Sequence, residues 1–182
     1  GAGPGAMDLM TLRAVEKLKQ AEVLVWADSL VCPQIIEIAP KECELIPTSS
    51  LTLEEILSIL INKWKAGKQV VRLHDGDPCL YGALSEQIFG LNEAGIEVEV
   101  IPGLSAFQAT AAALNAELTI PGIVQTIILS RTSGRTGKPD RERLENLAST
   151  RASLCLYLSA QHVDEVEEIL LKHYPAETPV AI

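Results

Sequence analysis

Two aspartates on one short turn are the side chains of this sequence best suited to bind a polar ligand. The turn, Asp75-Gly76-Asp77-Pro78, follows Val70–Leu73, an apolar and β-branched run that predicts a buried strand. An apolar pattern at helical spacing begins at Leu84, so the turn is expected at the carboxyl end of a strand, where ligands bind in open α/β sheets. Its carboxylates suit hydroxyl groups, a ribose or a cation. The plainer interpretation is that Asp77 only caps the turn.

Two further turns consist mostly of glycine and small residues. Gly1-Ala2-Gly3-Pro4-Gly5-Ala6 precedes a predicted helix, and such a turn lets a phosphate or another ligand approach the backbone closely. Pro102-Gly103-Leu104-Ser105-Ala106 follows a predicted strand, residues 96–101, and precedes a predicted helix, residues 106–116. The small residues of that helix also fit tight helix packing, which is the plainer interpretation of this second turn.

Asp28 stands directly after a predicted strand, residues 22–27. An acidic residue about 20 positions after a glycine-rich turn binds the ribose of a dinucleotide in one common fold, and Gly1, Gly3 and Ala6 fit that fingerprint loosely. Asp28 is equally suited to act as a general base in a cleft or to cap the segment 29–36. Its position alone leaves these three roles open.

One basic segment stands out in a chain whose net charge is −9. Residues 131–143 follow a predicted strand, residues 124–130, and carry the cations Arg131, Arg135, Lys138, Arg141 and Arg143. A solvated loop is the default interpretation. A clamp for an anionic ligand is the alternative, because guanidinium groups bind carboxylates bidentately.

The predicted elements alternate between strand and helix, which indicates a parallel sheet with helices on its faces. Residues 51–64 form an amphipathic helix in which Thr52 and Glu55 make a capping box. Beyond residue 124 the pattern continues with a strand at 154–158 and a helix at 163–171. We therefore predict an α/β fold with two α/β domains, residues 1–103 and 104–182.

Composition narrows the class of protein. With 182 residues, 21% of them charged and 47% hydrophobic, the chain has the composition of a soluble globular protein. The acidic balance argues against nucleic-acid binding, and no apolar run has membrane-spanning length, so neither partner is expected. The cysteines form no C-x-x-C pair and the histidines lie far apart. We predict reduced thiols, a cytoplasmic location and no metal site.

Both ends of the chain suggest missing elements. The first glycine-rich turn has no strand before it, and Thr178-Pro179-Val180-Ala181-Ile182 resembles the start of another strand. We expect the chain to be truncated at both ends.

Taken together, the three turns resemble those of the tetrapyrrole methylase family, the class III S-adenosylmethionine-dependent methyltransferases, along essentially the whole chain. Ala27-Asp28-Ser29-Leu30-Val31 is similar to the family's segment after its second strand. Glu117-Leu118-Thr119-Ile120-Pro121 and the region from Ser130-Arg131 to Gly134-Arg135-Thr136 look most like the branch that methylates precorrin-4 at carbon 11 in cobalamin biosynthesis, with or without cobalt.

The resemblance implies two α/β domains with the cofactor, S-adenosylmethionine, in a cleft between them, a tetrapyrrole substrate and a homodimer. By position, it places the cofactor contacts at Pro4, Asp75, Gly76, Asp77, Leu80, Ser105, Ala106 and Leu158. Asp28 falls where a related uroporphyrinogen methylase is assigned a proton acceptor. The proposed lysine donor of that relative has no counterpart in Ile46-Pro47-Thr48-Ser49-Ser50. We further expect Arg131 and Arg135 to bind the carboxylates of the macrocycle.

Other functions compete with this expectation. The chain could be a different tetrapyrrole methylase, acting on uroporphyrinogen III or another precorrin. It could be a nucleotide-dependent enzyme that uses residues 1–6 and Asp28, although Pro4 then interrupts the loop and the two later turns have no role. It could also be a non-catalytic domain that holds a nucleotide or a tetrapyrrole.

Overall fold

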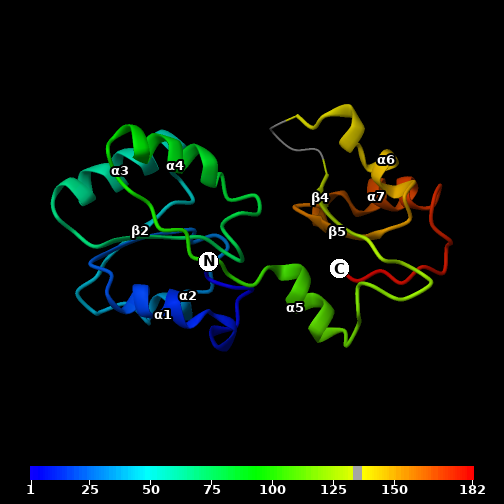
Figure 1. Cartoon of the computed structure of the whole chain (residues 1–182), viewed down its shortest axis with the longest axis horizontal. Coiled ribbons are helices and arrows are strands. Elements are labelled where there is room, and N and C mark those ends of the chain that lie inside the picture. Colours follow the sequence, from blue (N-terminus) through cyan, green and yellow to red (C-terminus); the bar gives the residue numbers. More distant parts are fainter. Residues whose placement is uncertain (133–136) are drawn as a thin grey trace. The chain divides into compact units, whose positions relative to one another are not determined.

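The protein is represented by a computed structural model that describes residues 1–132 and 137–182. It divides into two compact units, Gly1–Thr110 and Ala111–Ile182, which we describe separately (Figure 1). Each unit combines helices with parallel strands, which confirms the predicted α/β class. The predicted domain division after residue 103 remains a prediction.

The first unit contains a three-stranded parallel sheet in the order β2-β1-β3. Its strands are β1 (Val23–Trp26), β2 (Glu44–Pro47) and β3 (Val70–Leu73). Trp26, the last residue of the central strand, lies opposite Pro47 and Leu73. The three strands therefore end together, and the segments that follow them start from one edge of the sheet.

Helices cover both faces of this sheet, as Figure 1 shows. They are α1 (Leu12–Lys19) and α2 (Pro33–Ile36) on one face, and α3 (Leu53–Lys65) and α4 (Leu84–Glu93) on the other. Strand β1 alternates between the two cores: Leu24 packs with the residues of α1 and α2, whereas Val23 and Val25 pack with those of α3 and α4. Burial on both faces explains why β1 is continuously apolar.

Threonine side chains begin two of these helices. The Thr11 hydroxyl accepts a hydrogen bond from the Ala14 N–H at 3.2 Å and caps α1. At α3, the Glu55 N–H donates to the Thr52 hydroxyl at 3.3 Å and the Thr52 N–H donates to the Glu55 carboxylate at 2.8 Å. The predicted capping box is confirmed.

One predicted strand is absent, and one observed strand was not predicted. Residues 96–101 form no strand in the described structure, although apolar and acidic residues alternate there. Residues of both β3 and this segment line a cavity of about 360 Å³, and the sheet of the first unit, in the order β2-β1-β3, does not include the segment. Conversely, β2 was not predicted, because its residues are mostly exposed and show no buried apolar pattern.

The second unit is built on a two-stranded parallel sheet of β4 (Ile127–Arg131) and β5 (Ser153–Tyr157). Around it lie α6 (Leu144–Ala148) and α7 (Val163–Leu170). Short 3-10 helices complete both units: Met7–Leu9, Asp140–Glu142 and Ala160–His162. The predicted elements here are confirmed with shifts of a few residues at their ends.

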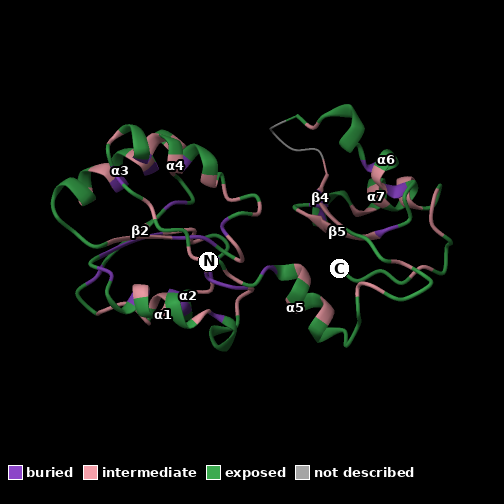
Figure 2. Ribbon diagram, viewed as in Figure 1, coloured by how far each residue is buried: buried purple, intermediate pink, exposed green. Residues whose placement is uncertain are grey.

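Helix α5 (Ala106–Ala113) follows the third turn and contains no buried residue: its ribbon in Figure 2 is green and pink, without purple. Burial in the first unit instead concentrates in β1 and in the inner faces of the helices around it (Figure 2). Among the described residues, no helix is long and apolar enough to cross a membrane.

Candidate functional site

The three predicted turns meet beyond the carboxyl edge of the first unit's sheet. The Gly76 N–H donates to the Gly3 carbonyl at 2.9 Å, and the Gly3 N–H donates back to the Gly76 carbonyl at 3.2 Å. The Ala2 N–H donates to the His74 carbonyl at 2.7 Å, and the Gly1 ammonium donates to the Ile101 carbonyl at 2.8 Å. The first turn thus connects the second turn to the start of the third.

Glycines allow these backbones to touch. A Cβ atom on Gly103 would collide with the Gly76 carbonyl oxygen, and one on Gly1 would lie 2.8 Å from the Gly103 Cα. Gly76 itself adopts a φ of +48°, a conformation that side chains disfavour. The three turns therefore form one backbone-on-backbone contact that no residue with a side chain would reproduce.

Asp77 joins two of the turns through its carboxylate. One oxygen accepts a hydrogen bond from the Cys79 N–H at 2.8 Å, and the other accepts from the Gly103 N–H at 3.0 Å. Burial acts to raise the pKa of Asp77, but the N–H groups of Gly103 and Cys79 outweigh it, so the pKa lies below its ordinary value. The plainer interpretation, a turn cap, is thus part of its role, and the bond to the third turn is the other part.

The other predicted cofactor contacts of the first unit surround this junction. Asp75 is exposed on the second turn, and the Leu80 N–H donates to the Asp77 carbonyl at 3.1 Å. Pro4 is half-buried beside Gly3. On the third turn, Ser105 is buried, and its N–H donates to the Gln108 side chain at 2.7 Å, while Ala106 is exposed at the start of α5. The turns therefore present an exposed carboxylate, small side chains and accessible backbone.

Asp28 connects β1 to the segment after β2. One carboxylate oxygen accepts from the N–H groups of Thr48 at 2.8 Å and Ser49 at 2.7 Å, and the other accepts from the Ser49 hydroxyl at 2.6 Å. The Ser49 hydroxyl is the main cause of a pKa below the ordinary value for Asp28. These bonds stabilise the ionised carboxylate and make it a weaker base, so the expected proton-acceptor role remains a prediction.

In the second unit, Arg131 and Leu158 lie at the carboxyl edge of the two-stranded sheet. Arg131 ends β4 opposite Tyr157, and Leu158 follows β5 with a φ of +55° and 67% exposure. The Thr132 N–H donates to the Ser159 hydroxyl at 3.1 Å and ties the two strand ends together. Arg135 lies outside the described residues, so its predicted contact with the substrate remains a prediction.

Part of the basic segment is engaged within the second unit. The Lys138 ammonium donates to the Ser130 hydroxyl at 2.9 Å and to the Arg131 carbonyl at 2.7 Å, and burial lowers its pKa. Arg143 pairs with Asp140 at 2.8 Å. The segment is therefore not a uniformly solvated basic loop.

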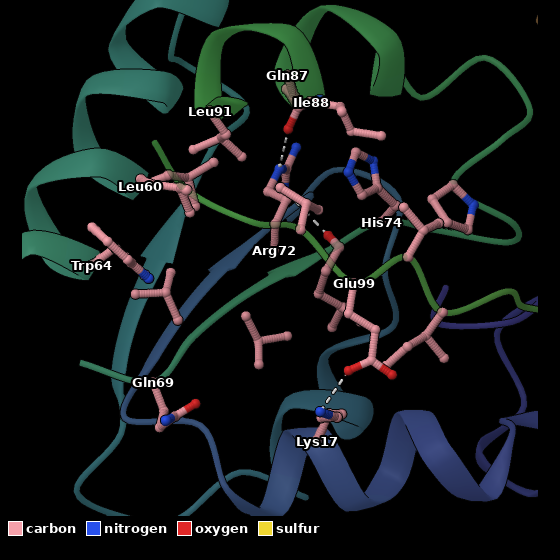
Figure 3. Close-up of a pocket in the computed structure, with 18 of the residues that line it drawn as sticks. Lys17, Leu60, Trp64, Gln69, Arg72, His74, Gln87, Ile88, Leu91 and Glu99 are labelled. Carbon is pink, nitrogen blue, oxygen red and sulfur yellow. Dashed lines mark hydrogen bonds and ion pairs between the residues drawn. The ribbon is translucent and has the colours of Figure 1, made fainter. Parts of the chain in front are cut away.

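Three polar side chains on and beside β3 were given no role from the sequence. Arg72, His74 and Gln87 line the cavity of about 360 Å³ near its junction with the second turn (Figure 3). Burial, with the nearby Arg72 guanidinium, lowers the pKa of His74 to about 4, and burial lowers the pKa of Arg72 to about 10. An arginine within the apolar strand Val70–Leu73 was the only sequence signal for this group.

Within the described residues, no group of three or more His, Cys, Asp or Glu side chains could hold a metal ion. The polar groups described at the junction of the three turns are backbone groups and carboxylates.

The chain belongs to a known class of enzyme. The chain is a member of the tetrapyrrole methylases: the family model described as Tetrapyrrole (Corrin/Porphyrin) Methylases matches residues 1–182. Enzymes of this family use S-adenosylmethionine, and the predicted resemblance is confirmed.

Individual relatives show which members of the family this chain is similar to. The precorrin-4 C(11)-methyltransferase of Pseudomonas aeruginosa is 43% identical over 182 residues, which make up 100% of this chain and 72% of that protein. The X-ray structure of a cobalamin biosynthetic enzyme, cobalt precorrin-4 methyltransferase, is similar with a TM-score of 0.90 and 40% identity, covering 95% of this chain and 72% of that one. The uroporphyrin-III C-methyl transferase of Thermus thermophilus, solved with S-adenosylhomocysteine, has a TM-score of 0.78 and 29% identity, covering 96% of this chain and 75% of that one.

Proposed function

We propose that this protein transfers a methyl group from S-adenosylmethionine to carbon 11 of precorrin-4 or cobalt-precorrin-4. The observation that carries the proposal is the identity of 40 to 43% to enzymes of that name, which extends over 95 to 100% of this chain. The likeness to the uroporphyrin-III enzyme is weaker, at 29% identity. Relatives named for the metal-free and for the cobalt-containing substrate match almost equally, so we propose the macrocycle without specifying its metal.

The junction of the three turns fits the cofactor. The exposed Asp75 carboxylate beside this junction can accept hydrogen bonds from ribose hydroxyls. When bound, S-adenosylmethionine supplies an electrophilic methyl group on a positively charged sulfur. We propose that the contacts predicted in the first unit, from Pro4 to Ala106, hold it, with Leu158 contributing from the second unit.

Asp77 has a supporting role in this proposal. Both of its carboxylate oxygens accept backbone hydrogen bonds, from Cys79 and Gly103, and therefore fix the second turn against the third. A rate gain in methyl transfer comes mostly from holding the acceptor and donor in line, and such positioning requires a rigid frame.

The remaining roles concern the substrate. Arg131, with Arg135, is proposed to bind carboxylates of the macrocycle, because guanidinium groups pair with carboxylates bidentately. Asp28 is proposed to accept the proton that the acceptor carbon loses. Its three hydrogen bonds from Thr48 and Ser49 keep it ionised and ready to accept, at the cost of lower basicity.

The proposal also includes the oligomeric state and the cellular location of the protein. We propose a homodimer, as the resemblance implies, and a cytoplasmic location. All four cysteines, Cys32, Cys43, Cys79 and Cys155, are free thiols, which is compatible with a reducing compartment.

Calorimetric titration with S-adenosylhomocysteine tests the cofactor class. Saturable heat that NAD leaves unchanged, and that Asp77→Ala weakens, supports the proposed site. Asp164→Ala, which removes an exposed carboxylate from α7 in the second unit, is the matched control and should bind normally. Binding that NAD abolishes would favour the nucleotide-enzyme alternative.

Mass spectrometry of the product tests the reaction itself. Incubation with S-adenosylmethionine and either precorrin-4 or cobalt-precorrin-4 should add one methyl group, which nuclear magnetic resonance should locate on carbon 11. Cofactor binding without any methylated tetrapyrrole would support the non-catalytic alternative, and methylation of uroporphyrinogen III instead would reassign the substrate.

A further inference from the structure

The loop that connects the second turn to α4 has an unusual backbone. Tyr81 and Ala83 adopt φ angles of +58° and +47°, in the left-handed region that residues with side chains disfavour. Two such residues within three positions raise the free energy of this loop, so other contacts must hold it in that shape.

The glycine between them is tightly enclosed. A Cβ atom on Gly82 would lie 2.6 Å from the Pro78 carbonyl oxygen and 3.2 Å from the His74 Nδ1. The loop therefore folds back onto the second turn.

Gln87 binds two carbonyl groups of this loop. Its side chain is only 4% exposed, and its Nε2 donates to the Gly82 carbonyl at 3.1 Å and to the Ala83 carbonyl at 3.0 Å. The side-chain amide thus donates both of its hydrogens to carbonyl groups in the strained part of the loop.

Arg72 determines which way this amide points. The Arg72 Nε donates to the Gln87 Oε1 at 3.3 Å, and its guanidinium also donates to the carbonyls of Val25 at 3.3 Å and Leu73 at 3.2 Å (Figure 3). A guanidinium has only donors, so it must face the amide oxygen and leaves the amide nitrogen facing the loop. The centre of the sheet is thereby connected to the loop through two side chains.

We propose that Gln87, oriented by Arg72, is a positioning residue that sets the shape of the loop 79–83 and through it the affinity for the methyl donor. The proposal rests on the proposed function for its second half, because Leu80, an expected cofactor contact, lies in this loop. Gln87 itself is not a catalytic residue: it acts through the carbonyl groups of Gly82 and Ala83.

Two substitutions separate the two sides of the Gln87 amide. Gln87→Met keeps the length of the side chain and removes all its side-chain hydrogen bonds, whereas Gln87→Glu keeps the acceptor for Arg72 and removes the donors to the loop. Gln69→Met is the matched control, because Gln69 lines the same cavity but is exposed (Figure 3). All variants are measured in the full chain by hydrogen exchange and by calorimetry with S-adenosylhomocysteine.

Faster amide exchange in the peptide that covers residues 78–84 is expected for Gln87→Met and for Gln87→Glu, with melting temperatures that show both are folded. We expect their dissociation constants for S-adenosylhomocysteine to rise about tenfold, as the loss of one or two hydrogen bonds predicts, while Gln69→Met changes neither quantity. Normal exchange and affinity in Gln87→Glu would overturn the proposal.

Failure of the proposed function gives a different result. If the unaltered chain does not bind S-adenosylhomocysteine, the affinity half of the proposal falls with the proposed function. Hydrogen exchange needs no ligand and still decides whether Gln87 holds the loop: equal exchange in Gln87→Met and the unaltered chain would refute that half too.

Discussion

The carboxyl edges of the two sheets are organised in different ways. In the first unit, three turns contact one another through backbone atoms at Gly1, Gly76 and Gly103, and Asp77 connects two of them. In the second unit, side chains form the edge: Arg131 ends β4, the exposed Leu158 follows β5, and Thr132 and Ser159 tie the two strand ends together. The first edge is therefore a frame of mutually contacting backbone, whereas the second edge carries longer side chains.

This difference fits two different recognition tasks. A cofactor that is always the same molecule can be held by a rigid backbone frame, whose groups lose little entropy on binding. A macrocycle with several carboxylates is better met by long cationic side chains, which adapt to each charge. We therefore expect substitutions at the first edge to act through the fold and those at the second edge through affinity.

The largest effect is expected from Gly103→Ala, since the new Cβ would collide with the Gly76 carbonyl. We predict a loss of about 3 kcal/mol in the free energy of unfolding, measured by urea denaturation, together with loss of S-adenosylhomocysteine binding. Gly137→Ala in the second unit, where a Cβ meets nothing within 4 Å, is the control and should change stability little. Equal stability of the two variants would show that the first edge is not rigid.

Acid pH should weaken the first unit through His74. The pKa of His74 is lowered from 6.5 to about 4 in the folded chain, so between these values the unfolded chain binds a proton that the folded chain does not. His74 therefore contributes no pH dependence above pH 6.5, and its contribution lowers stability by about 3 kcal/mol as pH drops to 4. Urea denaturation at several pH values should show this slope.

Replacing His74 with Asn should flatten that slope. Carboxylates with lowered pKa values, such as Asp28 and Asp77, lose their stabilisation mainly below pH 4 in both chains, so the difference between the two slopes isolates the contribution of His74. An unchanged slope in His74→Asn would mean that another group titrates in this range.

At the second edge, Arg131→Ala should change affinity alone. Loss of one charge-assisted pairing predicts a rise of about tenfold in the KM for the tetrapyrrole, with the dissociation constant of S-adenosylhomocysteine unchanged. Arg141→Ala removes a highly exposed cation from the same segment and is the control for general charge effects. If both variants raised the KM for the tetrapyrrole by similar factors, Arg131 would act only through nonspecific electrostatic attraction.

The smallest effect is expected from Ser49→Ala. Removing the hydroxyl that donates to Asp28 at 2.6 Å should raise the pKa of Asp28 toward its ordinary value. If Asp28 is the proton acceptor, the acid limb of the pH–rate profile should move to higher pH in the same direction. A pKa that rises, followed by nuclear magnetic resonance, without a shift of that limb would separate Asp28 from the chemistry.

Local sequence signals predicted much of the first unit. The β-branched run Val70–Leu73 formed β3 with those bounds, and the pair Thr52 and Glu55 began α3 as a capping box. The pattern at 96–101 failed, because alternation describes a half-buried strand but does not supply a neighbour to pair with. Strand β2 was missed for the converse reason: pairing with β1 forms it despite its exposed residues.

The sequence by itself determined the three turns, since glycine and proline restrict the backbone locally wherever they occur. It also determined the family, because the family model matches residues 1–182 on sequence. Three contacts were decided only by the tertiary structure. The Asp77 carboxylate accepts a hydrogen bond from the third turn as well as from its own, the Ser49 hydroxyl donates to Asp28, and Arg72 donates to the Gln87 amide oxygen. These are contacts between residues distant in sequence, and hydrogen bonds of that kind depend on distances that only packing sets.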